Sequence, residues 1–192
     1  MLNDKITLKD LSIFSADGGP DVFALIDRTA TQAGKEKLRK HIQEPAATYE
    51  QLKDIQDAIK FWSEHSDLWP KIILNGTLVM VDKFFESADT ITTPPSGINL
   101  LLNTFFQKLL NRQEYFLTQF SLSHLSDFLN GCKQLADIAD TPGVPALLNN
   151  ELKLIKEELQ HRLTDEITAI TKYTKYTDLA QLNYKARREM KN

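Results

Sequence analysis

Cysteine is nearly missing from this chain, which has a single one, Cys132, among 192 residues. One thiol cannot form an internal disulfide or a zinc site built from several cysteines. No run of 18 apolar residues occurs, so the sequence predicts no membrane-spanning helix. The first ten residues, MLNDKITLKD, lack the apolar core of a signal peptide. These absences predict a cytoplasmic protein that makes no membrane contact.

Glycine and proline are also scarce, with seven of each. This composition excludes collagen-like and linker-like chains. Hydrophobic residues make up 42% of the sequence, which a disordered chain would lack. The formal net charge of −3 argues against a dedicated nucleic-acid binder with a strong basic field. The length fits about one globular domain, at roughly 100–200 residues each.

Positive charge is nevertheless concentrated in residues 28–41, where Glu36 is the only acidic residue. The basic residues of this cluster are Arg28, Lys35, Lys37, Arg39 and Lys40. One interpretation is an ordinary solvated helix face. The other is a surface that contacts phosphates or an acidic partner.

Apolar residues recur at spacings of three and four along most of the chain, which predicts an all-α fold. Helices are expected over about 31–43, 48–65, 77–89, 98–119 and 122–139, and a short helix is expected from Val22. Pro45 should end the first of these, and a capping box at Thr48 should begin the next. Residues 6–14 fit either a short N-terminal strand or one helical turn.

The end of the chain, from residue 146 to 192, contains neither glycine nor proline. Its apolar residues keep the helical spacing at Leu152, Ile155, Leu159, Leu163, Ile167 and Ile170. A single long helix is therefore expected over about 146–185, as in a coiled coil or a lever.

The sequence contains no complete catalytic or ligand-binding motif. Residues 33–36, Ala-Gly-Lys-Glu, resemble the end of a phosphate-binding loop. That loop needs glycine five residues before its second glycine and Ser or Thr after the lysine, but Thr29 and Glu36 occupy these positions. No nucleotide site is expected here.

No metal site is expected either. The pair Glu158-x-x-His161 occurs once, whereas a di-iron site in a helical bundle needs two such pairs and further glutamates. Cys132 lies in an apolar stripe and is interpreted as a buried small residue. The sequence therefore predicts no catalytic and no metal-binding residue, and the chain itself is not expected to be an enzyme.

One family pattern is visible in residues 6–62. The short apolar segment at 7–14 is followed by the sequence VFALIDRTATQAGK at 22–35. The matching positions are Leu25, Asp27, Arg28, Thr29, Thr31, Gly34, Leu38 and Pro45. Ile55, Ala58 and Ile59 match in the next helix, where Gln56 replaces the usual arginine. In these residues the chain resembles the core, or lever, domain of the MutS family of DNA mismatch-repair ATPases. From about 63 to 192 the likeness is limited to helical character and a long final helix.

The resemblance implies a single helical core domain over 1–192, with a body over about 1–145 and the long helix after it. The ATPase, clamp and mismatch-reading domains of that family are absent from this sequence. The module would be non-catalytic and would couple a separate ATPase domain to DNA engagement. ATP and Mg²⁺ would bind only in that ATPase domain, so no cofactor is expected in this chain.

The implied partners are DNA, bound weakly and without specificity through the parent protein, the C-terminal ATPase domain, and a second copy of the parent protein. The alternative is a free-standing helical protein-interaction or scaffold module with no repair role.

The motif residues suit architectural roles. Thr29 and Thr31 are expected to cap the helix that follows them. Gly34 is expected to allow two helices to approach closely, and Leu38 to fill their contact.

Overall fold

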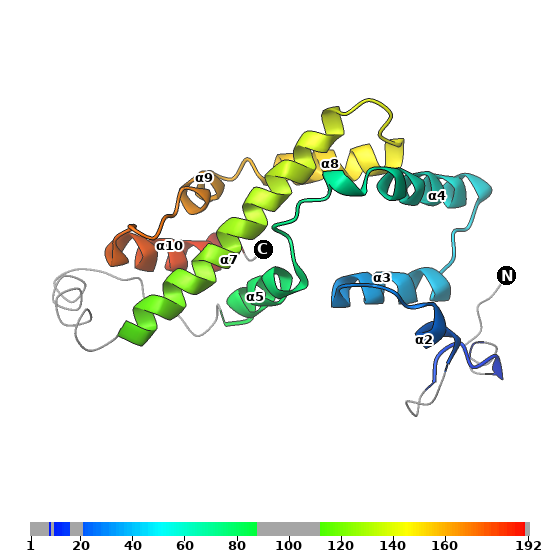
Figure 1. Ribbon diagram of the computed structural model, residues 1–192, viewed down its shortest axis with the longest axis horizontal. Helices are drawn as coiled ribbons and strands as arrows, with labels where there is room; N and C mark the ends of the chain where they lie inside the picture. The colour runs from blue at the N-terminus through cyan, green and yellow to red at the C-terminus, as the bar shows by residue number, and fades with distance from the viewer. Residues whose placement is uncertain (1–7, 9, 16–20, 88–111, 191–192) are drawn as a thin grey trace. The chain divides into compact units, whose positions relative to one another are not determined.

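The computed structural model describes residues 8, 10–15, 21–87 and 112–190. Every regular element among these residues is a helix, so the all-α prediction is confirmed and the short N-terminal strand is not present there (Figure 1). The α-helices are α2 (Val22–Ile26), α3 (Gln32–Gln43), α4 (Tyr49–Glu64), α5 (Asn75–Glu86), α7 (Arg112–Asp137), α8 (Ala146–Glu158), α9 (Arg162–Thr168) and α10 (Tyr176–Glu189). Two short 3₁₀ helices, η1 (Ser66–Leu68) and η3 (Ile138–Asp140), follow α4 and α7.

The chain divides into two compact units, Met1–Asp57 and Ala58–Asn192. The single domain expected over 1–192 stays a prediction. The first unit contains α2, α3 and the start of α4. The second contains the rest of α4 and all later helices.

Local capping signals begin and end the early helices as the sequence predicts. Thr31 caps α3, which ends at Gln43, two residues before Pro45. Thr48 Oγ1 accepts a hydrogen bond from the amide of Gln51 at 3.2 Å, and the Gln51 side chain accepts one from the amide of Ala47. The capping interaction at Thr48 is therefore confirmed, with the glutamine reaching one residue further back than a standard capping box.

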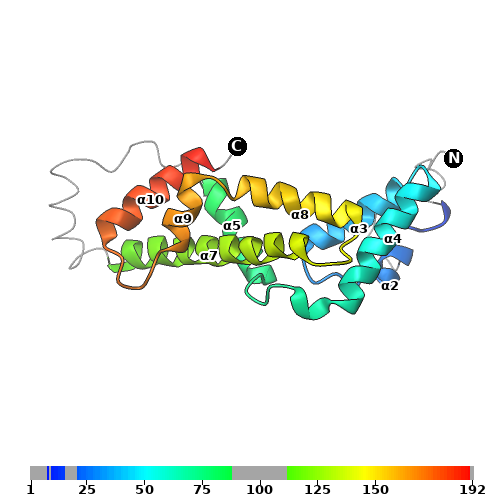
Figure 2. The same cartoon turned by 90° about the horizontal axis from the view of Figure 1, so that it is seen from above.

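Helix α7 is the central element of the second unit, and α5, α8, α9 and α10 all contact it (Figures 1 and 2). Its inner face contributes Leu122, Leu125 and Leu129 to a core shared with α5, α9 and α10. Further along, Leu135 joins a second core with Phe61 of α4 and residues of η3 and α8. One long helix thus contributes to two neighbouring cores.

Two helices were expected where α7 runs, one over 98–119 and one over 122–139. The structure shows one continuous helix through residues 119–122, so the predicted break is wrong. Its serines at 121, 123 and 126 have no intrinsic helix-breaking effect strong enough to outweigh the buried leucines between them. Residues 98–111 lie outside the described part of the chain.

A single long helix is expected over 146–185. The structure shows that this segment is mostly helical but forms three separate helices, α8, α9 and α10. The first break falls at His161, whose Nδ1 accepts a hydrogen bond from the Leu163 amide. At the second break the Thr171 amide donates to Thr174 Oγ1, and the Tyr173 amide donates to Thr171 Oγ1. Side chains that bond to nearby backbone offer it an alternative to the helix, and this stops the helix without glycine or proline.

The close backbone approach expected at Gly34 is found at Gly131 instead. A Cβ on Gly131 would lie 2.3 Å from Ile73 Cγ1 and 3.1 Å from Ile72 Cγ2, so α7 passes directly over the segment before α5. A Cβ on Gly34 would instead meet Thr31 Oγ1 at 3.0 Å, within its own cap. The prediction that Gly34 joins two packed helices is therefore wrong, because its neighbours are the side chains of Thr29 and Thr31.

Thr164 in α9 is a buried polar residue whose effect on stability can be tested. Its side chain is fully buried, and its hydroxyl has no hydrogen-bond partner among the described residues. Thr164→Val should raise the free energy of unfolding by about 1 kcal/mol, because it replaces an unpaired buried hydroxyl with a methyl group. Urea unfolding followed by circular dichroism measures this.

The matched control is Thr168→Val, in the same helix. Thr168 Oγ1 lies 2.9 Å from the carbonyl oxygen of Thr164 and 3.1 Å from Lys133 Nζ. Valine there removes both hydrogen bonds and should lower the free energy of unfolding by about 1 kcal/mol. Equal destabilisation by the two variants would show that the Thr164 hydroxyl has a partner.

Candidate functional site

The motif residues form a hydrogen-bonded junction between α2 and α3. Asp27 follows the last residue of α2, and its Oδ1 accepts hydrogen bonds from both the hydroxyl and the amide of Thr29, at 2.6 and 3.0 Å. Its other oxygen, Oδ2, pairs with Lys35 Nζ of α3 at 3.2 Å. One carboxylate therefore fixes the turn that leaves α2 and ties it to the first turn of α3.

Thr31 completes this junction. Its Oγ1 accepts a hydrogen bond from the Gly34 amide at 3.0 Å, which satisfies one of the free donors at the start of α3. The predicted cap is therefore confirmed for Thr31. It is wrong for Thr29, whose hydroxyl donates to Asp27 and does not accept from α3.

The hydrogen bonds from Thr29 hold the pKa of Asp27 at about 2, below its ordinary value of 3.8, and Lys35 adds to the effect. A depressed carboxyl pKa stabilises the fold at pH values above the unfolded pKa, and this contribution disappears as the pH falls through the folded pKa. The junction should thus be intact at pH 4 and above and should weaken towards pH 2.

We expect the amide resonance of Thr29 to titrate with a midpoint near about 2 in nuclear magnetic resonance spectra recorded from pH 7 downwards. In Asp27→Asn this titration should vanish, because the junction then contains no carboxyl group. A Thr29 midpoint at 3.8 or above would contradict the hydrogen-bonded geometry.

Arg39 makes a second set of contacts within the first unit, with two aromatic rings. Its guanidinium lies 4.6 Å from the ring centroids of both Phe14 and Phe23, which themselves are 5.4 Å apart. Phe23 is almost completely buried, and Lys35 lies 5.9 Å from its centroid. Arg39 thereby holds the segment before α2, α2 itself and α3 together through cation–π contacts.

The five basic residues proposed to contact phosphates do not form one surface. Lys35 and Arg39 are four residues apart, so they share the face of α3 that packs on Phe23. Lys37 and Lys40 lie on other parts of the helix circumference and are exposed. Lys40 is 4.0 Å from Glu44, and Arg28 bonds only to the backbone oxygen of Asp27 among the contacts described. Arg28, Lys35, Lys37 and Lys40 are all exposed, but Lys35 pairs with Asp27, so the exposed positive charge outside that ion pair lies on Arg28, Lys37 and Lys40.

The remaining motif residues include Leu38, which lies in α3, and Pro45, which follows the end of that helix. Leu38 is half-buried on α3, and no residue of that helix is fully buried. The motif thus brings Asp27, Thr29 and Lys35 together with the Thr31 cap beside them.

No group of three or more His, Cys, Asp or Glu residues in the described ranges is arranged to hold a metal ion. Glu158 ends α8, whereas His161 precedes α9, so these two exposed residues do not share a helix face. Cys132 is partly buried, and burial raises the pKa of its thiol to about 11, which keeps it protonated near neutral pH.

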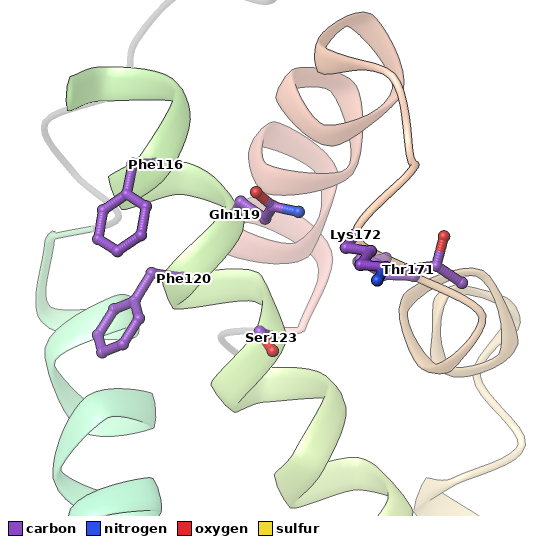
Figure 3. Close-up of a pocket in the computed structure, with 7 residues that line it drawn as sticks. Phe116, Gln119, Phe120, Ser123, Thr171 and Lys172 are labelled. Carbon is purple, nitrogen blue, oxygen red and sulfur yellow. The ribbon is translucent and has the colours of Figure 1, made fainter. Parts of the chain in front are cut away.

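A hollow that sequence reasoning missed lies in the second unit. It measures about 230 Å³ and is lined by residues of α7 and of the segment between α9 and α10 (Figure 3). The α7 residues are Phe116, Gln119, Phe120 and Ser123, and the others are Ile170, Thr171 and Lys172. Helical spacing alone would place the aromatic residues of α7 in the core, but Phe116 and Phe120 are 61% and 41% exposed.

Comparisons with known proteins give no family assignment: no family model, no curated protein and no solved structure matches this chain. Among the described residues, no helix has both the length and the apolar character needed to cross a membrane.

Proposed function

We propose that this chain is a non-catalytic core, or lever, module of a MutS-like DNA mismatch-repair ATPase, which couples a separate ATPase domain to DNA engagement. The observation that carries the proposal is the pattern of motif residues from Leu25 to Pro45, whose side chains make architectural contacts. ATP and Mg²⁺ would bind in the ATPase domain of the parent protein and not in this chain.

The junction at Asp27 suits such a role. A carboxylate that is bonded to the turn at Thr29 and to Lys35 of the next helix restricts the angle between α2 and α3. A coupling element must move as a rigid piece, because motion absorbed within it is not transmitted. The same contacts would also serve a free-standing scaffold module, which is the alternative function.

The reading frame that follows codon 192 distinguishes the two functions. A Gly-x-x-x-x-Gly-Lys-Ser/Thr phosphate loop within about 100 codons supports the lever module. A stop codon directly after codon 192 supports the scaffold module.

Where that frame encodes an ATPase domain, the full-length protein provides the functional test. Asp27→Ala should abolish the stimulation of ATP hydrolysis by DNA and leave DNA-independent turnover unchanged, because it loosens the junction without touching the ATPase site. Asp54→Ala, on the exposed side of α4, is the control and should alter neither rate. Unchanged DNA stimulation in Asp27→Ala would refute the coupling role.

DNA binding by the chain alone should be weak, salt-dependent and indifferent to mismatches. Three solvent-facing basic residues, Arg28, Lys37 and Lys40, can meet a few phosphates, against a net charge of −3. We expect a dissociation constant no tighter than about 10⁻⁵ M near physiological salt and a log–log salt slope of about −2 to −3. Fluorescence anisotropy with matched and mismatched duplexes at two salt concentrations measures both quantities.

The variant Lys37→Glu/Lys40→Glu should bring that slope close to zero. The control variant Lys71→Glu/Lys153→Glu makes the same charge change in the second unit and should leave most of the slope in place. Tight binding that prefers the mismatched duplex would show that this module reads DNA itself, and the lever interpretation would then be abandoned.

A further inference from the structure

The first half of α7 carries an exposed apolar surface that the proposed function does not use. Residues 115–126 contain no Asp, Glu, Lys or Arg. Phe116, Leu117 and Phe120 are 61%, 54% and 41% exposed, while Leu122 and Leu125 of the same segment are buried. Single exposed apolar residues are ordinary, but large ones on consecutive helical turns mark interaction sites.

The hollow beside this surface has an ordered chemical arrangement. The rings of Phe116 and Phe120 stack along α7 with centroids 6.0 Å apart and an interplanar angle of 19°. Figure 3 shows the two rings on one side of α7, and Gln119 and Ser123 on the side of α7 that faces the segment carrying Thr171 and Lys172. Aromatic rings, hydrogen-bonding groups and a cation therefore all line a hollow of about 230 Å³.

The charge around the hollow is positive, although the chain as a whole is negative. Residues 169–177 hold Lys172 and Lys175 and no acidic residue. Lys172 Nζ lies 5.0 Å from the ring centroid of Tyr173, and no carboxylate lines the hollow. The following residue, Asp178, accepts a hydrogen bond from Thr177. An incoming carboxylate would therefore find a lysine without a carboxylate partner among the described lining residues.

We propose that the surface formed by Phe116, Phe120 and Lys172 binds a short amphipathic, acidic segment of a partner protein. A large apolar side chain of that segment lies against the two rings, and a carboxylate pairs with Lys172. This mode resembles the docking of an amphipathic helix in an apolar groove, where apolar anchors supply affinity and charge supplies selectivity.

Other occupants fit the surface less well. A nucleic acid is held largely by several phosphate contacts, whereas the lining provides one lysine beside an uncharged helix. A second copy of the chain in a two-fold contact would bring this same surface to both sides, and its lining contains no carboxylate to pair with Lys172. The proposal is independent of the MutS-like function, since it rests on the second unit alone.

Two fluorescein-labelled probe peptides test the proposal. Each carries Leu at positions i, i+3, i+4 and i+7, and the other positions are Glu and Gln in one peptide and Lys and Gln in the other. Fluorescence anisotropy with the 192-residue chain should show binding of the acidic peptide at least about tenfold tighter than that of the basic peptide. Phe120→Ser should weaken binding of the acidic peptide about tenfold or more.

A charge reversal makes the test specific to the hollow. Lys172→Glu should weaken binding of the acidic peptide and strengthen binding of the basic peptide, so that the chain then prefers the basic one. The control Lys153→Glu, on an exposed face of α8, should leave the preference unchanged. Because Phe120 and Lys172 are exposed, both variants should keep the circular dichroism spectrum and melting midpoint of the parent chain.

Several results would overturn the proposal. These are equal binding of the two peptides, no saturable binding of the acidic peptide, or binding that neither variant alters. Tighter binding of a single-stranded oligonucleotide that depends on Phe120 and Lys172 would assign the surface to nucleic acid. Concentration-dependent dimerisation in analytical ultracentrifugation that Phe120→Ser abolishes would assign it to a second copy.

Discussion

Gly131→Val should lower the free energy of unfolding by about 3 kcal/mol, because the site has no room for a side chain. Gly131 is buried in α7, and a Cβ there would lie 2.3 and 2.7 Å from Ile73 Cγ1 and Cδ1. Ile73 is itself a core residue beside Phe61 and Leu135, so it cannot move away without disturbing its neighbours. The substitution must push α7 and the segment before α5 apart.

Gly76→Ala is the matched control for Gly131→Val. Gly76 lies in the first turn of α5, and nothing is within 4 Å of the position its Cβ would take. Alanine should therefore raise the free energy of unfolding by about 0.5 kcal/mol, through the lower conformational entropy of the unfolded chain. Chemical denaturation of both variants measures the difference. Similar unfolding midpoints for the two would show that α7 does not pass over Ile73 as closely as described.

Arg187→Ala should lower the free energy of unfolding by about 2 to 3 kcal/mol, since charged hydrogen bonds to buried groups are lost. The guanidinium of Arg187 donates from Nη1 to the Phe84 carbonyl at 2.6 Å and to Ser87 Oγ at 2.5 Å. Its Nε donates to Asn183 Oδ1 at 2.9 Å, and its centre lies 4.1 Å from the Phe84 ring centroid.

These contacts place a positive charge from α10 at the carboxyl end of α5, where the helix leaves carbonyl oxygens without partners. Burial lowers the pKa of Arg187, but a guanidinium stays charged. Alanine therefore removes both the charge at the end of α5 and the packing on Phe84.

Arg188→Ala is the control, because the neighbouring arginine is exposed and bonds to Tyr184 of its own helix. Its loss should change the free energy of unfolding by less than about 0.5 kcal/mol. Arg187→Lys should fall between the two, since a lysine keeps the charge but cannot reproduce the fork of donors. Equal stability of the Arg187→Ala and Arg188→Ala variants would rule out the role assigned to Arg187.

The resemblance of the motif residues stays the basis of the proposed function, and the structure changes what those residues are understood to do. Asp27, Thr29 and Lys35 form a junction, and Thr31 caps α3 as predicted. Arg39 was considered as a phosphate contact but stacks on Phe14 and Phe23. A stretch of basic residues gives no direct sign of which ones have aromatic or carboxylate neighbours.

The candidate binding surface on α7 could not have been found from spacing alone. Phe116 and Phe120 lie four residues apart, which places them on one face of α7. This spacing is the same for a buried face and for an exposed face, so it does not show which face is buried. Leu122, Leu125 and Leu129 form the stripe that faces the core. Which stripe is buried depends on where α5, α9 and α10 pack against α7.

The sequence by itself determined the helical class, the cap of α3 at Thr31, the end of that helix before Pro45 and the start of α4 near Thr48. Each of these depends on hydrogen bonds or steric limits within about four residues, so the local sequence contains the whole cause.

Tertiary structure decided the rest. It placed Leu152 of α8 in one core and Leu163 of α9 and Leu179 of α10 in the other. It also brought Gly131 against Ile73, and Arg187 against Phe84, 103 residues away in the chain. Contacts between residues so far apart depend on how whole helices pack, and helical periodicity at either end carries no information about the partner.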